Sequence, residues 1–341
     1  MKKNLTQEDI AIAAGVSRAT VSYVLTGKKK VSKETTDKIL KIAASYGYLN
    51  TRLKKSGKDR AKNSFIGFLV LPNWVNPNED YFVFAIQQGI NTMLKKSGHR
   101  LVYNRLETFE EADVPELLNF VKSVKGLIIL NPGNGAVYEN FMEWLHSRGV
   151  HHVLIGSPND EDTYYVDMDV VSSGYQCASI LLSKGCKNIV YIDSHKEMKQ
   201  SSQILKGFHL AHEERELQWI EENVIHVEDS SIEEGMRLAH SVIASGKKVD
   251  GFVTPNDILA RGVIIALQQQ QIKIPEEIKI VSLGGGVISS QISYPRISAV
   301  DYKPYQMGME AAEMLMEIIS KKRMRSTHSI FPATLIERET S

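Results

Sequence analysis

Residues 15–32, GVSRATVSYVLTGKKKVS, decide how the first part of the chain folds. Gly15 is placed to end one helix, which Thr6 would cap at its start, and Ser17 is placed to cap a second helix. Ser32 begins a third helix after three lysines. Two helices joined by a glycine turn of about three or four residues, with a third helix to complete a small core, predict a helix-turn-helix unit. The core-facing residues expected from helical spacing are Ile10, Ala13, Ala14, Val21, Val24, Leu25, Ile39, Ile42 and Ala43.

The charged residues are divided unevenly along the chain. Residues 1–62 hold fifteen Lys/Arg and five Asp/Glu, a net charge of +10, although the whole chain carries only +1. The remaining residues hold 26 Lys/Arg and 35 Asp/Glu, a net charge of −9. This division indicates that a small basic part faces a polyanion. A lysine-rich solvated surface would give the same totals, so the sequence motif has to decide between the two.

The start of the second predicted helix has the side chains needed to read DNA. A helix in the major groove, which is about 12 Å wide, presents its first turn to base edges, where short polar side chains and long donors are useful. The residues that supply this mixture are Ser17, Arg18, Ala19, Thr20 and Ser22. Phosphates fix position and dominate affinity without reading sequence. The lysines expected to contact them are Lys28, Lys29, Lys30, Lys33, Lys38 and Lys41.

These residues belong to a longer motif over the first fifty positions. Its members are Thr6, Asp9-Ile10-Ala11, Ala14-Gly15-Val16-Ser17, Thr20-Val21-Ser22-Tyr23-Val24-Leu25-Thr26-Gly27, Val31-Ser32 and Gly47-Tyr48. The motif resembles the DNA-binding headpiece of the LacI/GalR family of bacterial transcription regulators. The resemblance implies that Arg18 and Ala19 read bases and that Thr20 and Ser22 hold phosphates. The full set of expected DNA-binding residues is Thr6, Ser17, Arg18, Ala19, Thr20, Ser22, Tyr23, Lys28, Lys29, Lys30, Ser32, Asn50, Arg52 and Leu53.

Two features depart from that family's pattern. Position 23, usually arginine, is Tyr23 here, so a guanine contact is not carried over, whereas a contact to a thymine methyl group or a phosphate stays open. The next segment reads LNTRLKKSGKDRAKN, with Leu49 in place of a proline and Gly57 where the family has a leucine that wedges into the minor groove. We therefore expect a less bent operator, with Leu53 as the one substitute wedge.

From Ser64 onward, short apolar runs alternate with segments of helical period. The runs are 65–71, 100–104, 126–130, 151–155, 188–192, 223–227, 251–254 and 278–283, and the helical segments lie near 80–97, 112–123, 136–149, 170–185, 200–217, 231–246, 256–270 and 304–322. Such alternation predicts parallel, doubly wound sheets. Eight units exceed one ordinary open sheet. The expected fold is therefore α/β, with two doubly wound parallel-sheet lobes after a small all-α headpiece.

The body carries a second set of matching motifs. They are I-G-F-L-V-L-P at 66–72, G-L-I-I-L at 126–130, N-D-x-L-A-x-G at 256–262 and I-P-E-E-I-K-I-V at 274–281. They are similar to the body of the LacI/GalR family and to its periplasmic sugar-binding relatives. The resemblance implies a headpiece at 1–50, a hinge at 51–63 and a two-lobed effector-binding and dimerisation domain at 64–341. Lobe 1 would span about 64–163 and 293–322 and lobe 2 about 164–292 and 323–341, with three crossings between them.

The cleft between the lobes is the expected effector site. The family usually places an arginine three residues before a Gly-Phe pair and an aspartate after a later strand, but here these positions hold Ile204 and Gly284-Gly285-Gly286. Trp74 and Tyr302 could stack on a sugar or could pack the lobes. The expected effector-binding residues are Asn73, Trp74, Asn76, Tyr81, Phe82, Asn131, Ser157, Asp257 and Tyr302. The ligand stays open between an apolar or weakly polar molecule, a protein corepressor and no effector.

Patterns of catalysis and metal binding are weak. Asp167-Met168-Asp169 suits the start of a helix better than a metal pair, and Gly284-Gly285-Gly286 lacks the spacing of a nucleotide-binding loop. No catalytic residue, metal or cofactor is therefore expected, and the protein is not expected to be an enzyme. Cys177 and Cys186 should be reduced. Without a signal core or an apolar run of about 20 residues, we expect a cytoplasmic protein with no membrane partner.

The sequence predicts a homodimeric, sequence-specific transcription regulator, a repressor that binds a pseudo-palindromic operator in double-stranded DNA and responds to a ligand. The last residues, ERETS, have no leucine heptad, so a coiled-coil tetramer is not expected. One alternative is an activator of the same family. The other is a solute-binding or enzymatic α/β protein whose basic start does not bind DNA.

Overall fold

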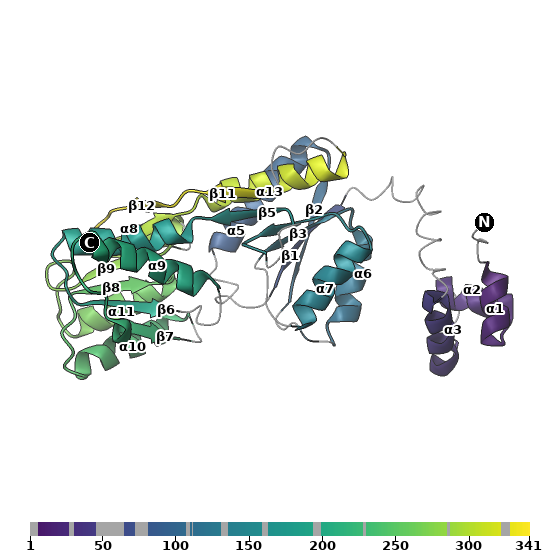
Figure 1. The fold of residues 1–341 in the computed structure, drawn as a ribbon, viewed down its shortest axis with the longest axis horizontal. Helices are drawn as coiled ribbons and strands as arrows, with labels where there is room; N and C mark the ends of the chain where they lie inside the picture. Colours follow the sequence, from purple (N-terminus) through teal and green to yellow (C-terminus); the bar gives the residue numbers. More distant parts are fainter. Residues whose placement is uncertain are drawn as a thin grey trace. The chain divides into compact units, whose positions relative to one another are not determined.

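A computed structural model describes residues 6–26, 31–45, 65–71, 81–106, 110, 112–130, 136–158, 163–193, 199–227, 230–284, 287–321 and 328–341. The chain separates into two compact units, Met1–Ser64 and Phe65–Ser341. Helices build the described part of the first unit, and two sheets with their covering helices build the second (Figure 1). The expected fold class is confirmed.

The first unit contains α1 (Gln7–Ala14), α2 (Arg18–Thr26) and α3 (Lys33–Ser45). Gly15 ends α1 in the left-handed conformation, with φ of 70°, as a glycine C-cap should. The three helices meet around a small core in which Ile10, Val21 and Ile39 are fully buried. One predicted core position is wrong: Ala13 is exposed, and Ala11 is buried in its place. The cause is that the face of α1 that contacts α2 and α3 passes through Ile10, Ala11 and Ala14.

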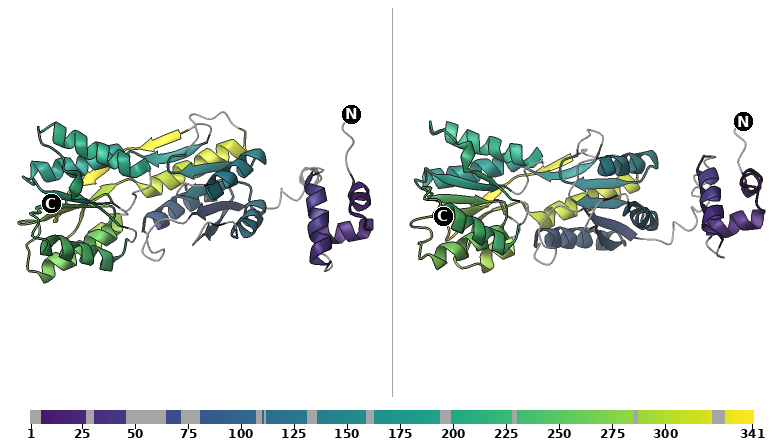
Figure 2. Two further views of the ribbon diagram at one scale, coloured as in Figure 1. Left: turned by 60° about the horizontal axis from the view of Figure 1, so that its bottom comes forward. Right: turned by 90° about the horizontal axis from the view of Figure 1, so that it is seen from below.

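The first sheet of the second unit is entirely parallel. Its strands, in spatial order, are β11 (His328–Phe331), β5 (Tyr165–Met168), β4 (His152–Ile155), β3 (Leu127–Leu130), β1 (Phe65–Val70) and β2 (Arg100–Arg105). Helices cover both faces (Figure 2). These helices are α5 (Tyr81–Lys96), α6 (Val114–Ser123), α7 (Ala136–Ser147) and α13 (Pro304–Ile319).

The second sheet is parallel except at one edge strand. In spatial order it contains β12 (Thr334–Ile336), which is antiparallel, then β10 (Ser298–Asp301), β9 (Lys279–Ser282), β8 (Gly251–Thr254), β6 (Ile189–Asp193) and β7 (Val224–His226). Its helices are α8 (Val170–Ser183), α9 (Lys199–Glu213), α10 (Ile232–Ala244), α11 (Asp257–Gln269) and α12 (Val287–Ile292). All eight predicted apolar runs form strands.

Alternate residues of each central strand enter different cores, as the two-residue period of a strand requires. In β1, Phe68 packs with the residues of α5 and α13, whereas Leu69 packs with those of α6 and α7. In β6, Tyr191 packs with α8 and α9, whereas Ile192 packs with α10 and α11. Both sheets are therefore covered on both faces, which is why their strands read as continuous apolar runs rather than as alternating ones.

The chain crosses between the sheets three times, and each crossing lies later than the sequence led us to expect. The expected crossings were near 163, 292 and 322, but β5 still pairs in the first sheet, β10 in the second and β11 in the first. The crossings therefore fall at residue 169, at 302–303 and at 332–333. The strands before them are only four residues long and carry polar side chains, so they lack the apolar run that marks a central strand.

Two glycines let α8 and α9 approach closely. A Cβ atom on Gly174 would lie 2.2 Å from the carbonyl oxygen of Ile204, and one on Gly207 would lie 2.2 Å from the carbonyl oxygen of Val171. No side chain larger than hydrogen fits at such contacts. These glycines fix the packing of α8, the helix that directly follows the first crossing.

Candidate functional site

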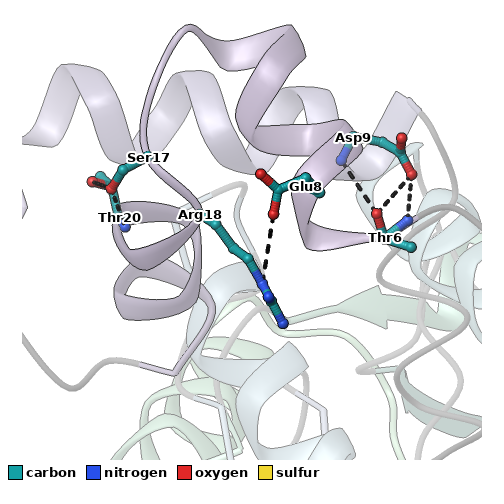
Figure 3. A network of polar contacts seen from close by, with 6 residues as sticks. All are labelled: Thr6, Glu8, Asp9, Ser17, Arg18 and Thr20. Atoms are coloured by element: carbon teal, nitrogen blue, oxygen red, sulfur yellow. Dashed lines mark hydrogen bonds and ion pairs between the residues drawn. The ribbon is translucent and has the colours of Figure 1, made fainter.

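The first turn of α1 is fixed by a reciprocal pair of caps. The backbone N–H of Thr6 donates to Asp9 Oδ2 at 2.7 Å, and the backbone N–H of Asp9 donates to Thr6 Oγ1 at 3.4 Å (Figure 3). This is a capping box in which aspartate takes the place of the usual glutamate. Thr6 is exposed at the start of the helix. Its hydroxyl also donates to Asp9 Oδ2, at 2.8 Å.

The start of α2 is fixed in a similar way. Ser17 Oγ accepts a hydrogen bond from the backbone N–H of Thr20 at 3.1 Å and lies 2.9 Å from Thr20 Oγ1. Ser17, Arg18 and Ala19 are exposed, while Val21 is completely buried against α1 and α3. The core therefore holds one face of α2 and leaves the first turn open to a partner.

Arg18 points from that first turn toward α1. Its Nε lies 3.8 Å from Glu8 Oε2, and both side chains are largely exposed, at 70% for Arg18 and 61% for Glu8 (Figure 3). Sequence reasoning missed Glu8, because the two residues belong to different helices and only the packing of α1 on α2 brings them together. The presence of an acid in the first turn of a helix was the only signal available.

The other expected DNA-binding residues are distributed over this unit. Thr20, Ser22 and Tyr23 are half-buried along α2, and Ser32 caps α3 by accepting from the backbone N–H of Thr35 at 3.2 Å. The exposed lysines of α3 are Lys33, Lys38 and Lys41. The expectations for Lys28, Lys29, Lys30, Asn50, Arg52 and Leu53 lie outside the described residues.

In the second unit, the first turns of α8 hold all three crossings. Asp169 Oδ1 caps the helix by accepting from the backbone N–H of Ser172 at 2.9 Å, and the backbone N–H of Asp169 donates to the carbonyl oxygen of Phe331 at 2.9 Å. Ser173 hydrogen-bonds to Tyr302 at the second crossing. At the third crossing, Gln176 donates to the carbonyl oxygen of Ala333 at 3.1 Å and accepts from the backbone N–H of Leu335 at 2.9 Å.

Two expected effector residues join this region. Ser157 follows β4 and donates a hydrogen bond to Asp167 Oδ2. Tyr302 is only 7% exposed and packs in the core shared by the two sheets, so its ring face is covered in this arrangement. Burial is the main cause that raises the pKa of Tyr302, and the nearby Asp167 and Asp169 raise it further. The hydroxyl is therefore a neutral hydrogen-bonding group.

The remaining expected effector residues lie at the ends of strands and helices. Tyr81 and Phe82 begin α5, where Tyr81 is exposed and Phe82 is half-buried, and Asp257 begins α11 and is buried. The expectations for Asn73, Trp74, Asn76 and Asn131 lie outside the described residues. Ile204, which stands where the family has an arginine, is buried within the α8–α9 core.

A polar cluster at the carboxyl end of β6 was not anticipated from the sequence. Asp193 is completely buried, and its Oδ2 accepts a hydrogen bond from Ser201 at 2.5 Å and lies 3.2 Å from His226 Nδ1. Tyr191 donates to Asp193 Oδ1 at 3.2 Å. Burial, followed by the charge of Asp193, raises the pKa of Tyr191 well above its usual value. The one sequence signal was an acid that directly follows the apolar run at 188–192.

Chemistry that an enzyme would use is not assembled among the described residues. They contain no group of three or more His, Cys, Asp or Glu placed to hold a metal ion. Cys177 is fully buried, and burial raises the pKa of its thiol, so it lacks the thiolate that a nucleophile needs. In the same parts of the chain, no helix combines the length and apolar character needed to cross a bilayer.

Comparisons with known proteins match both units. The family model for bacterial regulatory proteins of the lacI family matches residues 6–50, and the model for the periplasmic binding protein-like domain matches residues 178–341. The ribose operon repressor of Lactococcus lactis subsp. lactis (strain IL1403) is 24% identical over 335 residues, which is 98% of this chain and 97% of the relative. The HTH-type transcriptional regulator RegA of Clostridium saccharobutylicum is 26% identical over 339 residues, 98% of each chain.

Solved structures have the same fold. A complex of the transcriptional regulator CelR with cellobiose superposes with a TM-score of 0.72 at 21% identity and covers 99% of this chain and 100% of that chain. A LacI family transcriptional regulator from Enterococcus faecium with bound ribose gives a TM-score of 0.69 at 18% identity and covers 81% of this chain and 98% of that chain. The described geometry and these similarities agree on a helix-turn-helix unit followed by a two-lobed body.

Proposed function

Since the chain belongs to the lacI family of bacterial regulatory proteins, we propose that it inserts the first turn of α2 into the major groove of an operator and represses the genes beside it. The observation that carries this proposal is the exposure of Ser17, Arg18 and Ala19 at the start of a helix whose opposite face is locked in a core. A helix fits the groove, and its N-terminal residues meet base edges. The cytoplasm, where bacterial DNA lies, is then its place of action.

Affinity would come from the charge of the first unit. Residues 1–62 have a net charge of +10, which suits a surface that releases counterions from DNA. Polar side chains at helix starts and lysines would fix the position on phosphates while Arg18 and Ala19 read bases. The residues proposed for phosphate and backbone contacts are Thr6, Ser17, Thr20, Ser22, Tyr23, Lys28, Lys29, Lys30, Ser32, Asn50 and Arg52, with Leu53 as a wedge.

A homodimer would match a pseudo-palindromic operator, because two-fold symmetry in the protein mirrors two half-sites in the DNA. Support comes from aromatic side chains that stay exposed on the second unit. Phe84 is 53% exposed on α5, one helical turn from the exposed Tyr81, and Tyr103 is exposed on β2, an edge strand. Sedimentation of the wild-type protein and Phe84→Glu tests this, with a weaker dimer expected for the variant.

We propose a small-molecule effector bound between the lobes, near the carboxyl ends of the strands. The structures with cellobiose and ribose belong to other regulators, and they make these two sugars the first probes to use here. The arginine grip is absent, since Ile204 takes its place. Polar contacts would then come from Ser157, Asp257 and the other strand-end residues named above.

The DNA-binding proposal is tested with the intact protein and a duplex selected from a randomised pool. Arg18→Ala should reduce the preference for that duplex over random competitor by about 5- to 150-fold, the range for one bidentate base contact. Arg237→Ala, which removes an exposed arginine from α10, should leave the preference unchanged. Binding should also weaken steeply as salt rises. A wild-type protein that prefers no duplex, or an unchanged preference in Arg18→Ala, refutes the proposal.

A further inference from the structure

Glu8 is out of place on a surface that binds DNA. It is one of only five acids among residues 1–62, which carry fifteen Lys/Arg, yet it lies next to the residue proposed to read a base. A carboxylate near the phosphate backbone is repelled by it, so Glu8 would weaken binding to every duplex equally unless something compensates for its charge. Its neighbour Asp9 has a structural reason to be acidic, since both partners in the α1 capping box depend on its side chain. That reason does not extend to Glu8.

The partner of Glu8 is built into the packing of the unit. The capping box fixes the first turn of α1, and the hydrogen bond to Ser17 Oγ fixes the first turn of α2 (Figure 3). Ile10 and Val21, close to these turns, are fully buried in the shared core. The backbones that carry Glu8 and Arg18 are therefore held in place, and their side chains meet at 3.8 Å without a rearrangement.

We propose that Glu8 is a specificity-determining residue that acts through Arg18. This inference rests on the proposed DNA-binding function. The Glu8 carboxylate holds the Arg18 guanidinium over the first turn of α2 and keeps it from random phosphates. The guanidinium leaves Glu8 only where a base edge offers two acceptors, as guanine does with O6 and N7. Glu8 thus weakens non-specific binding more than operator binding.

The relative strengths of the two contacts permit this exchange. Both side chains of the ion pair are more than half exposed, and such pairs are worth at most about a fivefold change in an equilibrium constant. A bidentate arginine–guanine contact discriminates between bases by about 5- to 150-fold. Guanine can therefore displace Glu8, whereas one phosphate contact, opposed by the adjacent carboxylate, gains less.

The test compares Glu8→Gln with the matched control Glu34→Gln in the full-length protein. Both variants remove one exposed acid from the first turn of a helix in the same basic segment, α1 in one case and α3 in the other. The probes are the duplex that the wild-type protein selects from a randomised pool and a random-sequence duplex of equal length, titrated by fluorescence anisotropy at several salt concentrations.

For Glu8→Gln we expect about threefold to tenfold tighter binding to the random duplex and a smaller gain for the selected one, so that the specificity ratio falls by at least about threefold. The salt slope on the random duplex should steepen by about one, because Arg18 becomes free to contact a phosphate. Glu34→Gln should change both affinities alike and keep the ratio. An equal fall of the ratio in Glu34→Gln, or no fall in Glu8→Gln, overturns the proposal.

A double variant separates action through Arg18 from a direct contact by Glu8. In an Arg18→Ala background, Glu8→Gln should no longer change the ratio. A carboxylate that itself accepts from a cytosine amino group would instead give a loss on the selected duplex in both backgrounds, and that result would contradict the proposal. Equal helical content by circular dichroism excludes unfolding as the cause. If the wild-type protein selects no duplex, the proposed function fails first, and that outcome is distinct from a selective protein whose ratio ignores Glu8.

Discussion

Thr340→Val should destabilise the second unit, because the hydroxyl of Thr340 bridges two strands inside it. Thr340 is completely buried; its Oγ1 accepts from the backbone N–H of Ser298 at 2.9 Å and donates to the carbonyl oxygen of Ile280 at 2.7 Å. Ser298 begins β10 and Ile280 lies in β9, so this hydroxyl stands between neighbouring strands. The backbone N–H of Ile280 also donates to the carbonyl oxygen of Thr340 at 2.7 Å, which fixes the segment in place.

Valine has the same shape as threonine but no hydroxyl, so the variant leaves one buried donor and one buried acceptor with a lost partner. Each such group costs about 1–3 kcal/mol, and the added methyl group recovers part of that. We expect a loss of about 2–4 kcal/mol in the free energy of unfolding. For a domain near this size, that corresponds to a fall of roughly 4–12 °C in the unfolding temperature.

Calorimetry of the full chain at one scan rate measures this change, and Thr340→Ser is the matched control. Serine keeps both hydrogen bonds and loses one buried methyl group, which costs about 1 kcal/mol. The order of stability should therefore be wild type, then Thr340→Ser, then Thr340→Val. If Thr340→Val unfolds at the wild-type temperature, or above Thr340→Ser, the bridging hydroxyl does not have the role described.

Glu339→Gln should lower the unfolding temperature at about pH 7 and matter less at about pH 3, because hydrogen bonds from Arg296 depress the pKa of Glu339 below 4.5, and the stabilisation is lost as pH falls through that value; a pH-independent difference in calorimetry contradicts this. Gly174→Ala should cost at least about 1–3 kcal/mol, since its Cβ would meet a carbonyl oxygen at 2.2 Å, and unchanged stability argues against that close approach. Native Cys177 should resist thiol reagents and react only after unfolding, so rapid labelling, followed by mass spectrometry, disagrees with its burial. Leu53→Ala should abolish any residual operator bend; a bend that survives in a gel-shift phasing assay speaks against Leu53 as the wedge.

The sequence was most informative where a feature is specified locally. The starts of the three helices in the first unit were predicted because caps such as Thr6, Ser17 and Ser32 act within three residues of themselves. The central strands were predicted because strands covered on both faces read as apolar runs. In contrast, β5 and β11 are four-residue strands with polar members, and their partners lie far away in sequence, so no local signal marks them.

The unpredicted parts of the candidate site depend on tertiary contacts. Glu8 and Arg18 are ten residues apart on separate helices, and neither residue type indicates the other. Asp193, Ser201 and His226 come from three elements that meet only at the carboxyl end of β6. The sequence could predict that such edges bind ligands, but not which side chains satisfy one another there.

The three crossings all depend on one helix, which limits where an effector signal can act. Ser173 and Gln176 of α8 hold the second and third crossings, and Asp169 both caps α8 and forms the first. These bonds tie the crossings to the second lobe. A change in the angle between the lobes must therefore alter the contacts that the crossings make with the first lobe, such as the hydrogen bond from Asp169 to Phe331. An effector changes DNA affinity only by binding the two arrangements unequally, so its influence has to reach those contacts.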